Sequence, residues 1–523
     1  MDAFRKISPF TYLLMSAALC IVSYELFLYI GWQTDDAFIS RQAAKSFVDY
    51  GIFSWDRLAL GNESSTTSFL HVVILSILQF LVGSDDVAKA EIFLNISIIF
   101  LVFLYLLKSA GYKPTYIQAF LLSLISAPYA VFWIFSGLET GILVGLISYV
   151  FISGLQYLNG ESDKPPVLLI VVLAAVMRPD YILLVGSVAI LIFAKEGKFA
   201  CLRYAIQCLA LVIVFYCILY FILGDVLPAS YYFKVDAYSR LALGYSGILY
   251  LATYLFASLF LPLFLVILSG IVSRDSIRKF LTFFCSLSLI PAAATLNGGD
   301  WMAGFRFYAP IMIPFFYGCY YFLLSSNMLG KFNQLLLSLF ISIGIFSSNV
   351  LVSNLIIDRG ESNGNFEEMV INNREFRGHD PDLSYDHLYG ELIELIDSSE
   401  DISHVGLSEA GYIAFHISKP STDIQGLTHI QLARVRSERG VNSDEFMNWL
   451  NQRNVSHFIF WIKESDNVFV PRVAKEVAAY FVGNIETLDT CIYSRKIEDV
   501  YRFTHGSKGP LYVCLVRNPA YLR

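Results

Sequence analysis

Residues 203–223 read RYAIQCLALVIVFYCILYFIL, a run with no charged side chain after Arg203. A helix crosses the hydrocarbon core of a bilayer with about 20 apolar residues, so this run is long enough to span a membrane. The rest of the chain is similar: of its 523 residues 56% are hydrophobic and 15% charged, with a mean hydropathy of +0.57. Soluble proteins carry roughly 25% charged residues. The composition therefore predicts an integral membrane protein, and the net charge of −7 argues against nucleic acid as a partner.

Apolar runs of this kind recur along residues 1–355 and predict a polytopic α-helical membrane domain of about ten to twelve transmembrane helices. The other runs lie at 10–32, 67–83, 90–107, 115–134, 140–157, 166–194, 246–272, 280–296, 306–325 and 332–353. About half of the charged residues follow Asp358. Residues 356–523 are therefore expected to form a separate, hydrophilic α/β domain.

The pattern of the C-terminal domain alternates between strand and helix. Strands are expected at 404–415 and 455–462, and helices at 443–453 and 473–481. Two of the eight cysteines, Cys491 and Cys514, lie in this domain. They can form a disulfide if the domain faces an oxidising compartment, and the sequence leaves that pairing open.

Basic residues orient the predicted helices, because Lys and Arg are enriched in cytoplasmic loops. Arg5 and Lys6 precede the first run, and further clusters surround Lys195 and Arg278. Placing all of these in the cytoplasm puts the C-terminal domain and the first loop, residues 33–67, outside. Lys108 would then also be cytoplasmic, which requires an odd number of crossings after the first helix. Two apolar runs precede Lys108, and the sequence does not decide which of them spans.

The first external loop begins with Asp35-Asp36 directly after the first run. The spacing of apolar residues over 35–50 predicts an amphipathic helix on the membrane surface. Two adjacent carboxylates at a membrane boundary are costly to desolvate, and burial would raise the pKa of one and suit it to act as a base. A solvated helix N-terminus, where acids are favoured, is the alternative.

A later external loop reads Gly298-Gly299-Asp300-Trp301, followed by Arg306 at the start of the next run. A glycine pair lets the backbone approach a ligand closely. A carboxylate and a flat aromatic face suit a hydroxyl-rich sugar, and a guanidinium can hold a phosphate through two hydrogen bonds. An ordinary turn with an interfacial Trp is the alternative.

Three further polar positions interrupt or border apolar runs. Lys234 lies beside aromatic residues and could clamp a phosphate or anchor the chain at the interface. Arg178-Pro179-Asp180 interrupts the run 166–194, and Glu139 stands at the start of another run, where it could also cap a helix with Ser136. These groups recur at the outer ends of several spans, which predicts a shared site for an anionic group and a polar group at the outer membrane surface.

Together these residues resemble the bacterial GT-C membrane glycosyltransferases, in particular the terminal arabinofuranosyltransferase branch. The matching segments are DDAFISRQAAKSFVDYG (35–51), SGLET (136–140), RPD (178–180), LPASYYFK (227–234), GGDWMAGFRFYAP (298–310), EAGYIAF (409–415) and DIQGLT (423–428). The chain departs from that branch at 52–70, at Ala229 and at His429, positions that bear on the acceptor more than on the reaction.

The resemblance implies a GT-C fold and transfer of one sugar, with inversion, from a polyprenyl-phosphate donor on the periplasmic side of the bacterial inner membrane. Asp35 would be the base and Asp36 would position it or bind the sugar. The donor phosphate would be bound by Lys234, Arg306 and Arg178. The sugar or acceptor would be bound by Asp300, Trp301, Glu139, Gly298 and Gly299. The acceptor would be a surface glycan, a lipid-linked glycan or a pilin-like protein.

No cofactor or metal is required by this chemistry, because two or three cations can balance a phosphate leaving group. The Asp pair could still hold Mg or Mn. Two other functions stay open. One is an oligosaccharide transferase or ligase that uses a diphosphate-linked donor. The other is a lipid-sugar transporter or flippase, which should place its ionisable groups at mid-membrane on broken helices, as only 178–180 does here.

Overall fold

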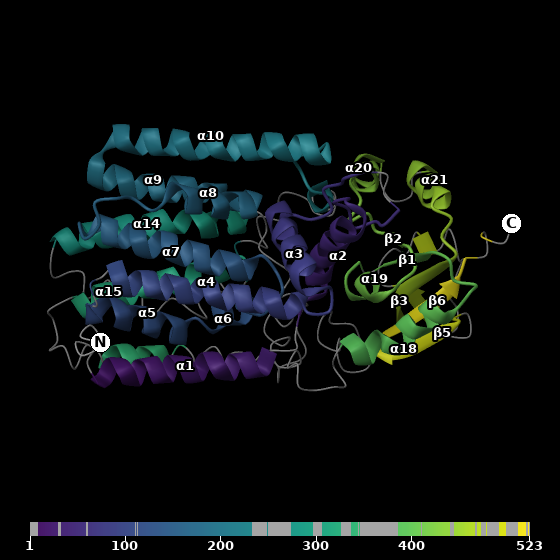
Figure 1. The fold of residues 1–523 in the computed structure, drawn as a ribbon, viewed down its shortest axis with the longest axis horizontal. Coiled ribbons are helices and arrows are strands. Elements are labelled where there is room, and N and C mark those ends of the chain that lie inside the picture. Colours follow the sequence, from purple (N-terminus) through teal and green to yellow (C-terminus); the bar gives the residue numbers. More distant parts are fainter. Residues whose placement is uncertain are drawn as a thin grey trace.

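The structure is a computed structural model in which a helical bundle lies at one end and a smaller domain with a sheet at the other (Figure 1). It describes residues 9–29, 33–58, 61–109, 111, 113–232, 248, 251, 274–296, 306–325, 336–343, 345, 385–408, 410–439, 444–465, 468–471, 477–478, 491–497, 511–518 and 521.

Most helices of the bundle run near-parallel and pack side by side (Figure 1). Its described helices are α1 (Pro9–Tyr29), α4 (Val87–Ser109), α5 (Pro114–Ser126), α6 (Pro128–Ile134), α7 (Thr140–Leu158), α8 (Leu168–Met177), α9 (Leu183–Glu196), α10 (Lys198–Leu223), α14 (Arg274–Leu296) and α15 (Ala309–Ser325). Among the described residues, four helices are each long and apolar enough to cross a membrane: α4, α7, α10 and the 277–295 part of α14. A polytopic helical membrane domain is thus confirmed, while its expected total of spans stays a prediction because run 246–272 and most of 332–353 lie outside the described residues.

Prolines break two of the predicted runs. Pro128 begins α6 after a bend of 79° from α5, so residues 115–134 form a bent pair of helices. Pro179 lacks a backbone N–H and disfavours the helical conformation in the residue before it, and α8 accordingly ends before Arg178, whose backbone is extended. A short 3-10 helix, η2 (Pro179–Ile182), then leads into α9. The break at Pro179 places Arg178 between two helical segments rather than inside a continuous span.

Two helices of the first half do not run with the bundle. α2 (Asp35–Tyr50) has the bounds predicted from the sequence, and it lies with α3 (Phe69–Val82) between the bundle and the C-terminal domain (Figure 1). The 14 residues of α3 extend about 21 Å, less than the hydrocarbon core of about 30 Å. Of these two helices only α4 is long and apolar enough to cross a membrane, and a single crossing between α2 and Lys108 stays a prediction.

The C-terminal domain contains a mixed sheet with strand order β2-β1-β3-β6-β5 and with β4 paired to β3. Its strands are β1 (Val405–Leu407), β2 (Ser421–Asp423), β3 (His457–Ser465), β4 (Val468–Pro471), β5 (Tyr493–Ile497) and β6 (Leu511–Arg517). Its helices are α18 (Tyr385–Ser398), α19 (Tyr412–His416), α20 (Ile430–Arg439) and α21 (Asp444–Gln452). β1 is parallel to β2 and β3, whereas β6 is antiparallel to β3 and β5. The predicted α/β class is confirmed.

One expected strand of this domain is wrong in its second half. Residues 404–415 were expected to form one strand, but β1 ends at Leu407 and the helix α19 begins at Tyr412. The apolar residues of both β1 and α19 are buried. A short continuous apolar run of this kind fits a buried strand and a buried helix equally well, so the pattern could not separate the two. The strand at 457–465 and the helix at 444–452 agree with expectation, while most of 473–481 lies outside the described residues.

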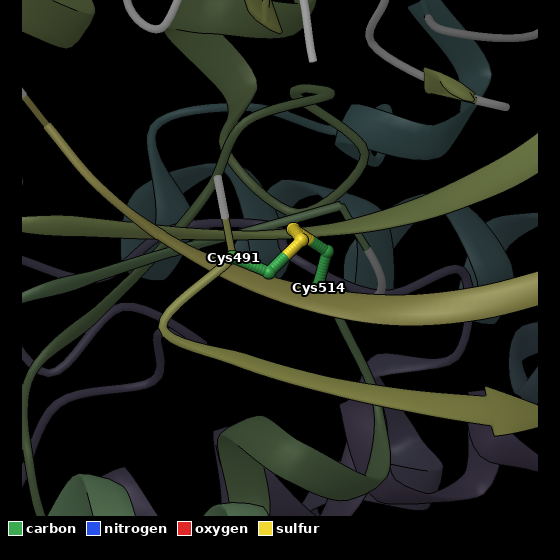
Figure 2. The surroundings of a disulfide bond; sticks show 2 residues. All are labelled: Cys491 and Cys514. Carbon is green, nitrogen blue, oxygen red and sulfur yellow. A yellow bond between two sulfur atoms is a disulfide. The ribbon is translucent and has the colours of Figure 1, made fainter. Parts of the chain in front are cut away.

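A disulfide joins Cys491 and Cys514 (Figure 2). Cys514 lies on β6 and Cys491 lies just before β5, the neighbouring strand. The sequence had left this pairing open. The bond therefore links the start of the edge strand β5 to β6, the strand that pairs with the central strand β3.

Candidate active site

The start of α2 is fixed against the turn that precedes α7. The backbone N–H of Thr34 donates to the carbonyl of Ser136 at 3.2 Å. Gly137 follows with a φ of +76°, in the left-handed region that favours glycine. A Cβ at Gly137 would also overlap the Arg41 side chain and contact Ala37 on α2. This close approach brings the segment 136–140 under the first turn of α2, which carries Asp35 and Asp36.

The Asp35 carboxylate is held by the C-terminal domain. The backbone N–H of Tyr412 donates to its Oδ1 at 2.7 Å. Burial raises the pKa of Asp35 to about 7, even though the N–H groups of Tyr412 and Gly411 act in the opposite direction, and the neighbouring charge of Asp36 adds to the rise. A carboxylate that takes up a proton near neutral pH is suited to act as a general base.

Asp36 faces a buried cation. Its Oδ2 lies 3.7 Å from Nη1 of Arg306, whose side chain is 7% exposed. The Arg306 guanidinium also lies 5.1 Å from the centre of the Phe307 ring. Arg178 lies over the same ring at 4.6 Å. Phe307 therefore contacts both guanidinium groups, and one of them, that of Arg306, lies beside Asp36 on α2.

Arg178 is paired with two carboxylates. Its Nη1 lies 2.8 Å from Oε1 of Glu139, and its Nε lies 3.1 Å from Oδ1 of Asp180. The side chains of Arg178 and Glu139 are 9% and 5% exposed, so this is a buried ion pair. The hydroxyl of Tyr181 on η2 donates to the Phe307 carbonyl at 3.3 Å, which ties the break after α8 to the start of α15.

The structure thus brings together five of the residues proposed from sequence, and they come from four separate segments: Asp35, Asp36, Glu139, Arg178 and Arg306. The other five lie outside the described residues: Lys234, Gly298, Gly299, Asp300 and Trp301. The segment before Lys234 is described as far as Tyr232, and there the N–H of Ala229 donates to the Ser64 carbonyl at 2.9 Å. The roles of all ten residues stay predictions.

A network behind α2 was not anticipated from the sequence. Glu91 on α4 accepts from Arg41 of α2 at 2.8 Å, and its other oxygen lies 2.8 Å from Nε2 of His71 on α3. All three side chains are at most 1% exposed. Arg41 lies within the segment 35–51, and the residues around it on α2 are buried. A charged residue at such a position was the one sign of this network that the sequence offered. The network fixes α2 at the bundle end, with Asp35 and Asp36 at its first turn.

A second group, here called the junction cluster, joins the first loop to the C-terminal domain and consists of Asp56, Glu63, His429 and Arg453. Arg453 lies 2.8 Å from Asp56 and 2.9 Å from Nε2 of His429, which lies 3.2 Å from Glu63. Burial raises the pKa of Glu63 to about 7, and the Asp56 charge adds to the rise. Burial, with the charge of Arg453, lowers the pKa of His429 to about 3. Neutral His429 therefore lies beside a Glu63 that retains its proton to near neutral pH.

The described carboxylates do not make a good metal site at the Asp pair. Among the described residues, no group of three or more His, Cys, Asp or Glu side chains could hold a metal ion. Asp35 accepts from a backbone N–H, and Asp36 lies beside the positive charge of Arg306, which would repel a divalent cation. The earlier suggestion of Mg or Mn stays a prediction that these contacts do not favour.

Comparisons with known proteins show the fold. No protein-family model and no curated protein matches the chain. Among solved structures, ArnT from Cupriavidus metallidurans bound to undecaprenyl phosphate matches with a TM-score of 0.55 at 10% identity, over 96% of this chain and 97% of that one. The apo state of the same protein matches with a TM-score of 0.45. The likeness to the lipid-bound structure confirms the GT-C fold that the sequence predicted.

Proposed function

We propose that this chain is a GT-C membrane glycosyltransferase that moves a single sugar from a polyprenyl-phosphate donor to an acceptor hydroxyl. One observation carries the proposal: Asp35, a partly buried carboxylate with a pKa near 7, lies at the end of the bundle beside Asp36 and the buried cation Arg306, directly beneath the C-terminal domain. A base and a cation in one place are the two groups that transfer from a phosphate donor needs.

The proposed reaction is a single displacement. Asp35 takes the proton of the acceptor hydroxyl, and the acceptor oxygen forms its bond to the anomeric carbon from the face opposite the phosphate. The bond from that carbon to the phosphate oxygen breaks, and the polyprenyl phosphate leaves with the electron pair. The anomeric configuration inverts. Arg306 and Lys234 stabilise the charge that develops on the phosphate, a contribution of roughly a hundredfold or more in rate for each contact.

The remaining residues are proposed to orient the sugar and acceptor. Asp300 and Trp301 would bind sugar hydroxyls, and the Gly298-Gly299 pair would let the backbone approach them. Glu139 and Arg178 are already paired with each other, so we assign them first to the shape and charge balance of the site and only indirectly to the donor. Asp36 would hold Arg306 in place until the phosphate enters.

Two observations support the donor and the orientation. The solved structure that shares the fold holds undecaprenyl phosphate, a polyprenyl phosphate. The disulfide between Cys491 and Cys514 is of a kind that persists in oxidising compartments, which supports a periplasmic C-terminal domain and location in the bacterial inner membrane. Arabinofuranose as the sugar rests on the sequence resemblance alone, and a surface glycan, a lipid-linked glycan and a pilin-like protein are the proposed acceptor classes.

Transfer by the purified protein in liposomes tests the proposal. Labelled polyprenyl-phosphate sugars, with arabinofuranose first, are supplied with membrane glycan extracts, and the label is followed into product together with release of polyprenyl phosphate. We expect transfer that Asp35→Asn abolishes. Transfer only from diphosphate-linked donors would replace the proposed donor, and movement of lipid-sugar across the bilayer without transfer would replace the enzyme by a flippase.

A further inference from the structure

This inference rests on the proposed function and concerns how Asp35 is held. The C-terminal segment 410–418, here called the anchoring segment, contains α19 and contacts α2. Its Tyr412 N–H donates to Asp35 at 2.7 Å, and the Gly411 N–H also acts on that carboxylate. The amides that fix the proposed base therefore come from the C-terminal domain, across 377 residues of sequence, and not from the helical bundle.

Gly411 is the position at which Asp35 comes closest to the segment. A Cβ built at Gly411 would overlap the carboxyl carbon and both oxygens of Asp35. The φ of Gly411 is −95°, outside the left-handed region, and its ψ of −104° lies outside the main α and β regions. Among the contacts described for Gly411, it is the Asp35 carboxyl that excludes a side chain.

The anchoring segment is held in this place by the first loop, through backbone atoms. Trp55 Nε1 donates to the Ala410 carbonyl at 2.7 Å. Arg57 donates to the carbonyls of Ala414 and Ile417, at 3.2 and 2.9 Å. Because both ends of the segment are bonded to one loop, the amide of Tyr412 has a defined position relative to α2.

One face of α2 receives the anchoring segment. Asp35, Phe38 and Lys45 lie on that face at helical spacing. The Phe38 ring packs edge-on against Tyr412 with centroids 5.0 Å apart, and the Lys45 ammonium reaches the Phe415 carbonyl at 3.5 Å. The contact is thus continuous along the helix, with Asp35 at its first turn.

We propose that the anchoring segment is a positioning element for the base: the Gly411–Tyr412 backbone orients the Asp35 carboxylate toward the acceptor, and Gly411 is glycine so that the carboxylate can lie there. Docking of the C-terminal domain is then part of assembling the site. Gly411 and Tyr412 act through Asp35 and are positioning residues.

Gly411→Ala tests this, because the added methyl group forces the Asp35 carboxyl off the Tyr412 N–H and toward water. We expect kcat to fall at least about tenfold with little change in the KM for the donor. The acid limb of the kcat profile should also move from near pH 7 to lower pH, because burial, the largest cause of the raised pKa of Asp35, is then relieved.

Gly390→Ala is the matched control. Gly390 lies on α18 in the same domain, and a Cβ there meets no atom within 4 Å. We expect this variant to keep the wild-type kcat and pH profile. If Gly411→Ala behaves like Gly390→Ala in both measurements, the positioning role is wrong.

Hydrogen–deuterium exchange of the full-length protein in lipid nanodiscs keeps the test decisive if Gly411→Ala does not fold. Asp35→Asn retains an oxygen that accepts from Tyr412, so the amides of 410–418 should exchange slowly, as in wild type. Asp35→Ala removes the acceptor, and exchange at 411–412 should rise at least about tenfold. Equal exchange in the two variants would overturn the contact.

The inference and the proposed function can fail separately. A wild-type protein that transfers no sugar refutes the function, whatever the exchange data show. An active wild type in which Asp35→Asn is inactive, while Gly411→Ala keeps full rate and an unchanged acid limb, upholds the function and refutes the positioning role.

Discussion

Two partly buried carboxylates of this protein, Asp35 and Glu63, have a pKa near 7 for the same main reason, which is loss of solvation. Their neighbours differ. Glu63 lies in the junction cluster, where its near neighbours are His429, 3.2 Å away, and the Asp56–Arg453 ion pair. Asp35 accepts from a backbone amide, and the adjacent Asp36 leads to Arg306 at 3.7 Å.

The comparison shows that a shifted pKa alone does not identify a catalytic group, because structural ion-pair networks shift pKa values too. The junction cluster pairs its acids with an Arg and a His that belong to the other domain, which suits docking. The Asp35 site places a potential base near cations that an anionic donor could use, which suits chemistry. The same contrast separates Arg178, bonded to two carboxylates at 2.8 and 3.1 Å, from Arg306, which lies 3.7 Å from the Asp36 carboxylate.

The largest effect is expected from removing the base. Asp35→Asn keeps the size and the accepting oxygen of the side chain but cannot take a proton at neutral pH. We expect sugar transfer to fall by about 10²- to 10⁴-fold at normal membrane levels. The matched variant at the other carboxylate, Glu63→Gln, should keep activity within a few-fold. If the two variants lose activity equally, the distinction between the two sites fails.

Arg178→Gln should lower the stability of the protein more than it lowers the rate of sugar transfer. The substitution leaves the buried carboxylate of Glu139 and the partly buried one of Asp180 without their cation; breaking a buried ion pair typically costs roughly 3–5 kcal/mol. We expect a lower midpoint of thermal unfolding and less protein in the membrane. Lys113→Gln serves as the control, because Lys113 forms an exposed pair with Glu161 and should contribute at most about 1 kcal/mol.

Arg306→Gln should lower the rate of sugar transfer more than it lowers the stability of the protein. We expect kcat/KM for a polyprenyl-phosphate donor to fall by about a hundredfold, because a charge-stabilising contact to the leaving phosphate is lost. The unfolding midpoint should change less than in Arg178→Gln. A variant with wild-type kinetics and a large loss of stability would show that Arg306 is structural, as we hold Arg178 to be.

The sequence predicted those parts of the molecule that depend on local patterns. The amphipathic period of 35–50 predicted the bounds of α2, and the triplet 178–180 marked the break that places Arg178 between two helical segments. The gathering of Asp35, Glu139, Arg178 and Arg306 followed from their recurrence at the outer ends of runs. For these features the deciding information lies in residue type and spacing.

The parts that were missed depend on contacts made by backbone atoms or between distant segments. Residues 404–415 look extended because their apolar pattern is continuous, yet α19 is held by Trp55 and Arg57 through carbonyl groups that any sequence carries. The glycine at 411 was quoted within a motif, but its reason, the Asp35 carboxyl, lies 376 positions earlier in the sequence. Likewise, the apolar run 67–83 did not reveal that its helix, α3, has only 14 residues and lies with α2 between the bundle and the C-terminal domain.

The smallest expected effect concerns the pH dependence of stability in the junction cluster. Folding raises the pKa of Glu63 from 4.5 to about 7, so the folded protein retains a proton that the unfolded chain releases between those values. Stability from this group is therefore present below about pH 4.5 and is lost as pH rises through 7. His429 acts oppositely: its pKa falls to about 3, so its contribution is lost as pH falls below 6.5.

Glu63→Gln keeps a neutral side chain at every pH and should remove only the loss at high pH. We expect its unfolding midpoint to exceed that of wild type by roughly a few degrees at pH 8 and to match it at pH 5. Glu400→Gln, an exposed change in the C-terminal domain, should show no such difference between the two pH values. If Glu63→Gln shifts the midpoint equally at pH 5 and pH 8, Glu63 does not hold a proton in the folded protein, and its likeness to Asp35 disappears.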